Sequence, residues 1–137
     1  MPNAVDRLAS EIDDACDRVT ARILEEVPAY RDDPLAASML GPYVRQNADE
    51  AIRALRGEPT TMAAARNVGL SAAIGTSLDL DAVLRAYAVA RDAFVDRLRA
   101  LAADGEDVSE AIRSFHAAYA EATAAVGEAY LAAKSGR

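Results

Sequence analysis

The stretch from Ser77 to Gly105, SLDLDAVLRAYAVARDAFVDRLRALAADG, decides the fold of this 137-residue chain. Its large apolar residues recur at spacings of three and four, which places them on one side of a helix. Charged residues such as Asp81 and Arg85 fall on the opposite side, where they meet solvent. The pattern predicts a long central helix over about residues 78–103 with one side facing a core. That side holds Leu80, Val83, Leu84, Tyr87, Ala90, Phe94, Leu98 and Leu101.

A second strip on the same helix consists of small residues, among them Ala82, Ala86 and Ala93. Small side chains let the backbone of another helix come close. A helix with two apolar strips has neighbours on two sides. The segment from about residue 61 to 74 is itself rich in Ala, Gly and Ser, so we expect it to form a helix that packs against this alanine strip.

Arg91 interrupts the main apolar side, because a helical wheel places it near Leu84 and Leu98. A charge removed from water costs several kcal/mol unless it is paired and hydrogen-bonded. Its guanidinium group therefore reaches solvent along its own stem, pairs with a carboxylate, or binds an anion. The first two explanations are the simpler ones, and the third remains open.

The amino-terminal half is predicted to hold two further helices. Asn3 can cap a first helix that ends near Pro28. A connection with a short helical turn over residues 35–39 follows. Pro42 then suits the first turn of a second helix that stops at Gly57, with Asn47 at the margin of its inward side.

The last helix is predicted to run from a capping box formed by Asp107 and Glu110 to about Lys134. We see no internal repeat and no linker. The chain is therefore expected to be a single all-α domain over residues 1–137. It would contain about five main helices in a bundle-like or globin-like arrangement.

Composition excludes several classes of function. The 22 acidic and 15 basic residues give a net charge of -7, which argues against direct contact with nucleic acid. No apolar run approaches the roughly 20 residues that span a membrane, and no export signal is visible. Cys16 is the only cysteine and lies on an apolar face, which indicates a buried thiol. These features predict a cytoplasmic protein without a membrane segment.

Catalytic and metal-binding patterns are not apparent. His116 is the only histidine and lies at the edge of the apolar row of the last helix. Without a second ligand nearby it is a remote candidate for a haem ligand, and a solvated or satisfied side chain is the simpler interpretation. No GxSxG elbow and no glycine-rich phosphate loop is present. We expect no enzyme activity, no metal and no cofactor.

The tyrosines suggest a binding site instead. Each hydroxyl needs a partner if it is buried. Tyr87 stands one helical turn before Arg91, and together with Asn47 and Tyr43 these residues could line a pocket for a small anionic or polar ligand. A core whose polar tips reach water is the simpler alternative.

Several of these segments resemble a known family. The run from Gly75 to Phe94 carries the most distinctive pattern, and Tyr30 with Arg31, the inward asparagine at Asn47 and the LRG ending at Gly57 agree with it. The chain resembles the RsbT co-antagonist N-terminal domain. RsbR-type stressosome proteins and many actinobacterial PucR/CdaR-type transcriptional regulators share this helical domain.

The resemblance implies a bacterial sensory or regulatory domain, related in its stressosome members to globins that hold no haem. Such domains are often dimeric and fused to an output domain, and they supply no catalytic residues. We therefore expect a non-catalytic signalling domain that forms a homodimer through its first or last helix. It would relay a ligand or partner signal to a transcriptional or stress-response output through a protein partner or a fused output domain. The alternative is a small-molecule sensor with a pocket near Arg91, for an anionic or haem-type ligand.

Overall fold

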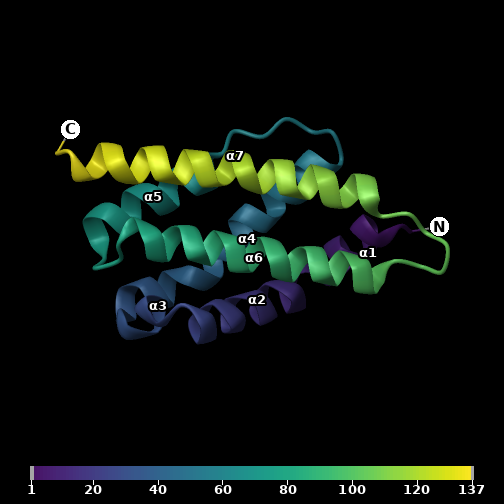
Figure 1. Cartoon of the computed structure of the whole chain (residues 1–137), viewed down its shortest axis with the longest axis horizontal. Coiled ribbons are helices and arrows are strands. Elements are labelled where there is room, and N and C mark those ends of the chain that lie inside the picture. Colours follow the sequence, from purple (N-terminus) through teal and green to yellow (C-terminus); the bar gives the residue numbers. More distant parts are fainter. Residues whose placement is uncertain (1, 137) are drawn as a thin grey trace.

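The computed structural model describes residues 2–136, which form a bundle of seven helices (Figure 1). The predicted all-α class is confirmed, but the prediction of about five main helices is wrong. The helices are α1 (Ala4–Ser10), α2 (Ile12–Glu26), α3 (Pro28–Asp32), α4 (Pro34–Leu55), α5 (Ala63–Gly75), α6 (Leu80–Leu101) and α7 (Ser109–Lys134).

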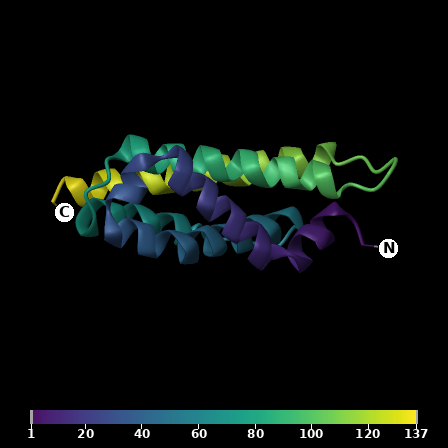
Figure 2. The same ribbon diagram turned by 90° about the horizontal axis from the view of Figure 1, so that it is seen from below.

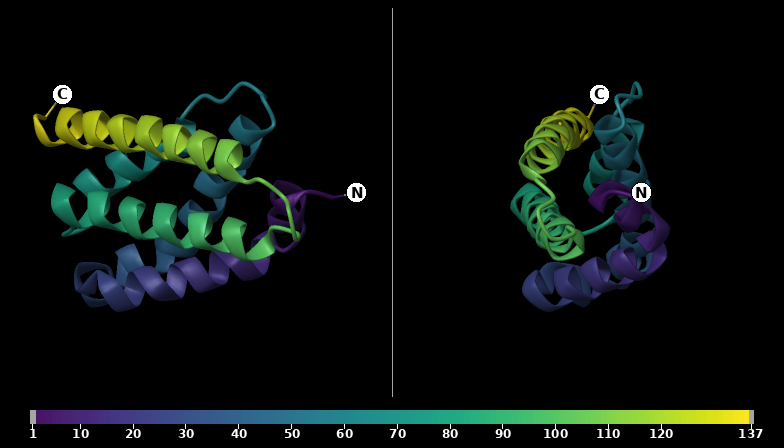
Figure 3. Two further views of the ribbon diagram at one scale, coloured as in Figure 1. Left: turned by 45° about the vertical axis from the view of Figure 1, so that its right-hand side comes forward. Right: turned by 90° about the vertical axis from the view of Figure 1, so that its right-hand side faces the viewer.

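The helices lie in two layers around a common core. Figure 2 shows α6 and α7 in one layer and α4 and α5 in the other. Helix α2 runs along the other side of α6, so that α6 lies between α2 and α7 (Figures 1 and 3). The central helix therefore has neighbours on two sides, as its two apolar strips predict.

Helix α6 matches the predicted central helix closely. The Asp79 side chain caps it by accepting a hydrogen bond from the Ala82 amide at 2.8 Å. Val83, Phe94 and Leu98 are fully buried on its predicted inward side. The Phe94 ring lies against two aromatic rings of α7, which ties the middle of α6 to its neighbour.

The predicted first helix is in fact two helices, because the chain breaks at Glu11 between α1 and α2. The Glu11 carboxylate pairs with Arg97 of α6, with 2.9 Å between Nη2 and Oε2. The break lets α1 cross the end of α6, where Arg7 donates a hydrogen bond to the Leu101 carbonyl at 2.8 Å. Contacts between helices thus decide where this amphipathic segment bends.

Helix α4 runs without interruption through Gly41 and Pro42, where a connection and a new helix start are predicted. That prediction is wrong. Pro42 has no amide hydrogen, so the helix lacks one hydrogen bond to the Ser38 carbonyl. Burial of Leu40 and Val44, on either side of Pro42, offsets this loss.

Helix α5 forms as predicted but packs mainly against α7, and it touches α6, the predicted partner, only slightly. At Gly69 the two backbones nearly touch. A Cβ atom added there would lie 2.4 Å from the Val126 carbonyl oxygen and 2.9 Å from the Ala129 Cβ. Two small residues, Gly69 and Ala129, make this close approach possible.

The predicted capping box at the start of α7 is also wrong, because Asp107 accepts a hydrogen bond from the Ser109 amide and Glu110 takes no part. Glu106 organises this corner instead. One carboxylate oxygen accepts from the Ala103 amide at 2.9 Å and from Arg7 at 3.1 Å. The other accepts from the Ala4 amide at 2.8 Å, which joins the loop before α7 to α1.

Glu106→Gln should remove part of the acid sensitivity of the fold. Hydrogen bonds from the Ala103 and Ala4 amides, and then Arg7, hold the pKa of Glu106 below its usual 4.5. A carboxyl group whose pKa is lower in the folded than in the unfolded protein stabilises the fold. This stabilisation is fully present above the pKa of the unfolded state and is lost as pH falls through the pKa of the folded state. Urea unfolding from pH 7 to pH 3 should therefore show wild type more stable than Glu106→Gln at neutral pH, with the difference shrinking in acid.

A matched control is Glu110→Gln, because the Glu110 side chain is 90% exposed. It should leave both stability and its pH dependence unchanged. A stability difference between wild type and Glu106→Gln that stays constant from pH 7 to pH 3 would contradict the hydrogen bonds described for Glu106.

Candidate functional site

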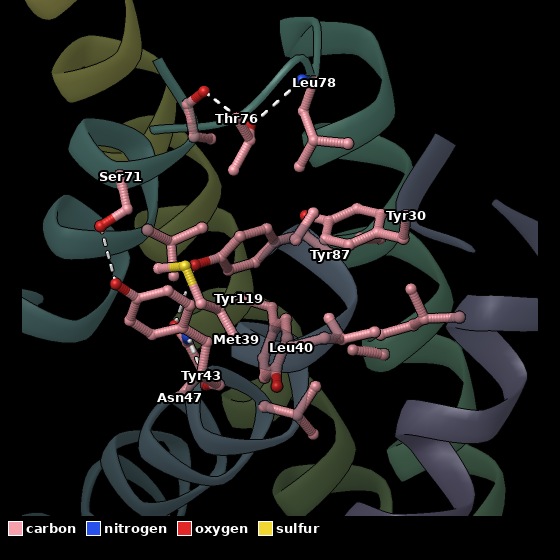
Figure 4. A pocket seen from close by; sticks show the side chains of 17 residues that line it. Tyr30, Met39, Leu40, Tyr43, Asn47, Ser71, Thr76, Leu78, Tyr87 and Tyr119 are labelled. Atoms are coloured by element: carbon pink, nitrogen blue, oxygen red, sulfur yellow. Dashed lines mark hydrogen bonds between the residues drawn. The ribbon is translucent and has the colours of Figure 1, made fainter. Parts of the chain in front are cut away.

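A cavity of about 50 Å³ lies between α4, α5, α6 and α7, with Ile23 and Tyr30 closing it from the side of α2 and α3 (Figure 4). Seventeen side chains line it, and none of them is charged. Most are aliphatic. The polar members are Tyr30, Tyr43, Asn47, Ser71, Thr76, Tyr87 and Tyr119.

Asn47 is the centre of a buried hydrogen-bond chain. Its Nδ2 donates to the Tyr43 carbonyl one turn earlier in α4 at 2.9 Å, and its Oδ1 accepts from the Tyr87 hydroxyl at 3.1 Å. The chain links α4 to α6 across the cavity. The second N–H of the Asn47 amide is not used by any residue that the structure describes.

The mouth of the cavity lies between α4 and α5. Here the lining side chains Met39, Tyr43, Ser71 and Thr76 are only half-buried. The Tyr43 hydroxyl and the Ser71 Oγ form a hydrogen bond of 2.7 Å, which bridges the two helices at this edge (Figure 4). A molecule entering from solvent would pass this bridge.

Tyr119 of α7 has a buried hydroxyl without a hydrogen-bond partner, the one such side-chain atom among residues 2–136. Its ring stacks on Phe115 with centroids 4.9 Å apart and lies 6.2 Å from the ring of Tyr87, so its position is fixed by packing. Burial raises the pKa of Tyr119 and keeps the phenol neutral. An unpaired buried hydroxyl costs about 1–3 kcal/mol, so this group calls for an explanation.

The structure brings together three of the four residues predicted to bind a ligand. Tyr43, Asn47 and Tyr87 line the same cavity. Arg91 does not, because its guanidinium group turns outward and pairs with Asp92, with 3.0 Å between Nε and Oδ1. Tyr119 was not among the predicted site residues. The sequence places it in the inward row of its helix, but which tyrosine lacks a partner depends on the packing of four helices.

The other singled-out residues lie away from the cavity. His116 is exposed on α7 and does not line it. Cys16 is buried as predicted, and desolvation raises the pKa of its thiol to about 12. Within residues 2–136, no group of three or more His, Cys, Asp or Glu side chains is placed to hold a metal ion. Nor is any helix in that range long and apolar enough to cross a membrane.

A second hollow, of about 270 Å³, lies on the surface between α2 and α6. Three arginines line it, and each pairs with a carboxylate. Arg18 contacts Asp14 at 2.9 Å, Arg22 contacts Glu26, and Arg97 contacts Glu11. The first two pairs lie within α2, and the third joins α6 to the junction of α1 and α2, so we regard this hollow as structural.

The fold and the cavity define the class of the protein as a helical-bundle domain with a small uncharged cavity. Residues 13–136 match the family model described as the RsbT co-antagonist protein rsbRD N-terminal domain. The chain belongs to this family, which confirms the resemblance carried by Gly75 to Phe94. The family consists of regulatory and signalling domains of the stressosome context and is not a known family of enzymes. No curated protein and no solved structure is similar enough to the chain to count as a match.

Proposed function

We propose that the chain is a non-catalytic regulatory domain that forms a homodimer and relays a ligand or partner signal to a transcriptional or stress-response output. The family match over residues 13–136 carries this proposal. The output would be a protein partner or a fused domain in the cytoplasm. The net charge of -7 on this chain makes direct binding to nucleic acid unfavourable.

The exposed apolar side chains favour α7, together with α5, over the first helix as the dimer surface. Four large ones are exposed in the described residues: Leu35, Leu70, Ile74 and Leu131. Neither α1 nor α2 contributes any of them. Leu131 of α7 is 60% exposed. Leu70 comes directly after Gly69, where α5 approaches α7 most closely. Placing these side chains between two copies would remove apolar surface from water.

Leu131→Glu should weaken the dimer about ten-fold or more, because it places a carboxylate in an apolar contact. Sedimentation velocity over a range of protein concentrations measures the change. Ala21→Glu adds the same charge on an exposed position of α2 and should leave the dimer intact. A wild-type monomer at all concentrations would contradict dimerisation, and loss of the dimer only in Ala21→Glu would move the interface to α2.

A second candidate function is a small-molecule sensor, and the uncharged cavity lined by Tyr43, Asn47 and Tyr87 is the observation that favours it. Native mass spectrometry of the freshly purified protein tests both candidates together. A dimer without added mass favours a domain that responds to a protein partner. A reproducible adduct favours the sensor.

A further inference from the structure

We propose that the cavity binds a small uncharged molecule whose oxygen accepts a hydrogen bond from the Tyr30 hydroxyl. This inference rests on the sensor function and names the chemical class of the ligand. It differs from the anionic or haem-type ligand considered from the sequence, since Arg91 and His116 lie outside the cavity.

The Tyr30 hydroxyl is unpaired and reaches the cavity. Tyr30 lines the cavity and is only 5% exposed, yet its hydroxyl forms no hydrogen bond with any of residues 2–136. It still keeps accessible surface, because within that range only the Tyr119 hydroxyl is both unpaired and closed off. A molecule in the cavity can therefore touch the hydroxyl of Tyr30, which it cannot do at Tyr119.

Tyr30 enters the cavity from α3, on the side away from the mouth. Figure 4 shows its ring across the lining side chains from Tyr43 and Ser71, with the hydroxyl directed inward. Burial raises the pKa of Tyr87, and the nearby Tyr30 hydroxyl contributes in the same direction. The unpaired hydroxyl thus lies near the hydrogen bond between Tyr87 and Asn47, at the inner side of the cavity.

The other hydroxyl groups of the lining that reach the cavity are committed or lie at the mouth. Tyr87 donates to Asn47, and Thr76 donates to a backbone carbonyl of α5 at 2.8 Å. Tyr43 and Ser71 bond each other, and the hydroxyl hydrogen that this bond leaves over lies at the half-buried mouth, within reach of water. The free donors farther in are the hydroxyl from α3 and the second N–H of Asn47, so a ligand must bring an acceptor.

The lining requires an uncharged ligand. Bringing an ion into such a site without a countercharge costs far more than a hydrogen bond returns. No Lys, Arg or His side chain lines the cavity, and no Asp or Glu does. Burial raises the pKa of Tyr30, Tyr87 and Tyr119, so these phenols stay neutral.

The volume limits the part of the ligand that is enclosed. A buried water occupies roughly 10–15 Å³ of such space, so a cavity of about 50 Å³ holds only a few non-hydrogen atoms. The half-buried mouth between Tyr43 and Ser71 would let a longer molecule extend outward. The enclosed end is then a short apolar group with one oxygen that reaches Tyr30.

Water alone suits this cavity less well. A buried water usually makes about three hydrogen bonds, and several waters would need correspondingly more partners. The lining offers mainly aliphatic and aromatic surface, and its free inner donors are the Tyr30 hydroxyl and one N–H of Asn47. An organic group with one acceptor matches this ratio of apolar to polar surface better.

Methyl NMR with three probes of the same branched shape tests the proposal. Acetone is the neutral acceptor, acetate its charged counterpart, and isobutene the counterpart without oxygen. The signals to follow are those of the lining residues Met39 and Leu40, with the exposed Leu131 as a reference. Acetone should shift the lining signals in a saturable manner, with a dissociation constant of roughly a millimolar or weaker for so small a molecule, and acetate should not.

The position of bound acetone can be measured in wild type alone. Intermolecular NOEs should connect the acetone methyl groups to the ring protons of Tyr30. Saturable acetone binding without these NOEs would contradict the proposed contact.

Two variants that each lose one hydroxyl separate the hydrogen bond from general effects on the fold. Tyr30→Phe should weaken acetone about five-fold, which corresponds to one neutral hydrogen bond, while isobutene binding is unchanged. This variant keeps the ring and loses no hydrogen bond within residues 2–136, so it should fold as wild type does. Tyr119→Phe is the matched control, because its ring lines the cavity and its hydroxyl is closed off, and it should leave the affinity for both probes unchanged.

Several results would overturn the proposal. Equal acetone affinity in wild type and Tyr30→Phe, or acetate binding as tightly as acetone, would refute the ligand class. If isobutene enters and acetone does not, the ligand class is wrong while a sensor for an apolar molecule survives. If neither enters, the ligand class and the sensor function fall together, and the protein-partner function is unaffected.

Discussion

Gly69→Ala is expected to lower the free energy of unfolding by about 3 kcal/mol, because it adds a methyl group where the described residues leave no space for it. The added Cβ would lie 2.4 Å from the Val126 carbonyl oxygen and 2.9 Å from the Tyr130 amide nitrogen. Both are backbone atoms of α7, so no side chain can rotate away and the helices must separate. Urea unfolding followed by circular dichroism measures the loss.

Gly127→Ala is the matched control for this substitution. It lies in α7, close in sequence to the same contact, but a Cβ there has nothing within 4 Å. Because glycine weakens a helix interior, alanine should stabilise the protein by roughly 0.5–1 kcal/mol. If both variants change stability by the same amount, the close approach of α5 and α7 is not as described.

Phe94→Ala is expected to destabilise the domain by about 4 kcal/mol, a large part of the roughly 5–15 kcal/mol that holds a domain folded. Phe94 is 1% exposed, and its ring centroid lies 5.8 Å from that of Phe115 and 6.5 Å from that of Tyr119. Removing the ring leaves a cavity between α6 and α7 that the remaining aromatic rings cannot fill.

Leu70→Ala serves as the control for Phe94, since Leu70 is 47% exposed on α5. In the monomer it should change the free energy of unfolding by no more than about 0.5 kcal/mol. A loss below 1.5 kcal/mol for Phe94→Ala in the same urea experiment would mean that α6 and α7 are not joined through these rings.

The elements that the sequence predicts well are those whose signals are local. Apolar residues recur with helical spacing along the whole of α6, and Asp79 caps its first turn. The bounds of α6 agree with the prediction within two residues. Helices α5 and α7 are also predicted correctly in extent. Periodicity and caps act within a few residues, so a single sequence contains them in full.

The errors arise where contacts between distant residues outweigh local preferences. Pro42 suggests a helix start, but burial on both sides of it keeps α4 continuous. Glu11 is not a residue type that ends a helix. Its ion pair with Arg97 joins residues 86 positions apart in the sequence. The partner of α5 depends on Gly69 facing α7, which no pattern within α5 reveals.

The candidate site was predicted in part for the same reason. Tyr43, Asn47 and Tyr87 lie on inward sides of their helices, so helical periodicity places them near one another. Arg91 lies at the edge of an inward side, where a small rotation of the helix decides between core and solvent, and Asp92 provides its partner. The unpaired hydroxyl of Tyr119 follows from the packing of the whole bundle.

The packing of α7 buries the Tyr119 hydroxyl without a hydrogen-bond partner, and urea unfolding of wild type and Tyr119→Phe tests this most directly. A hydroxyl that is buried and unpaired lowers stability, so Tyr119→Phe should raise the free energy of unfolding by about 1–2 kcal/mol. If Tyr119→Phe instead unfolds more easily than wild type, the hydroxyl already has a partner, and α7 packs against its neighbours differently from the arrangement described.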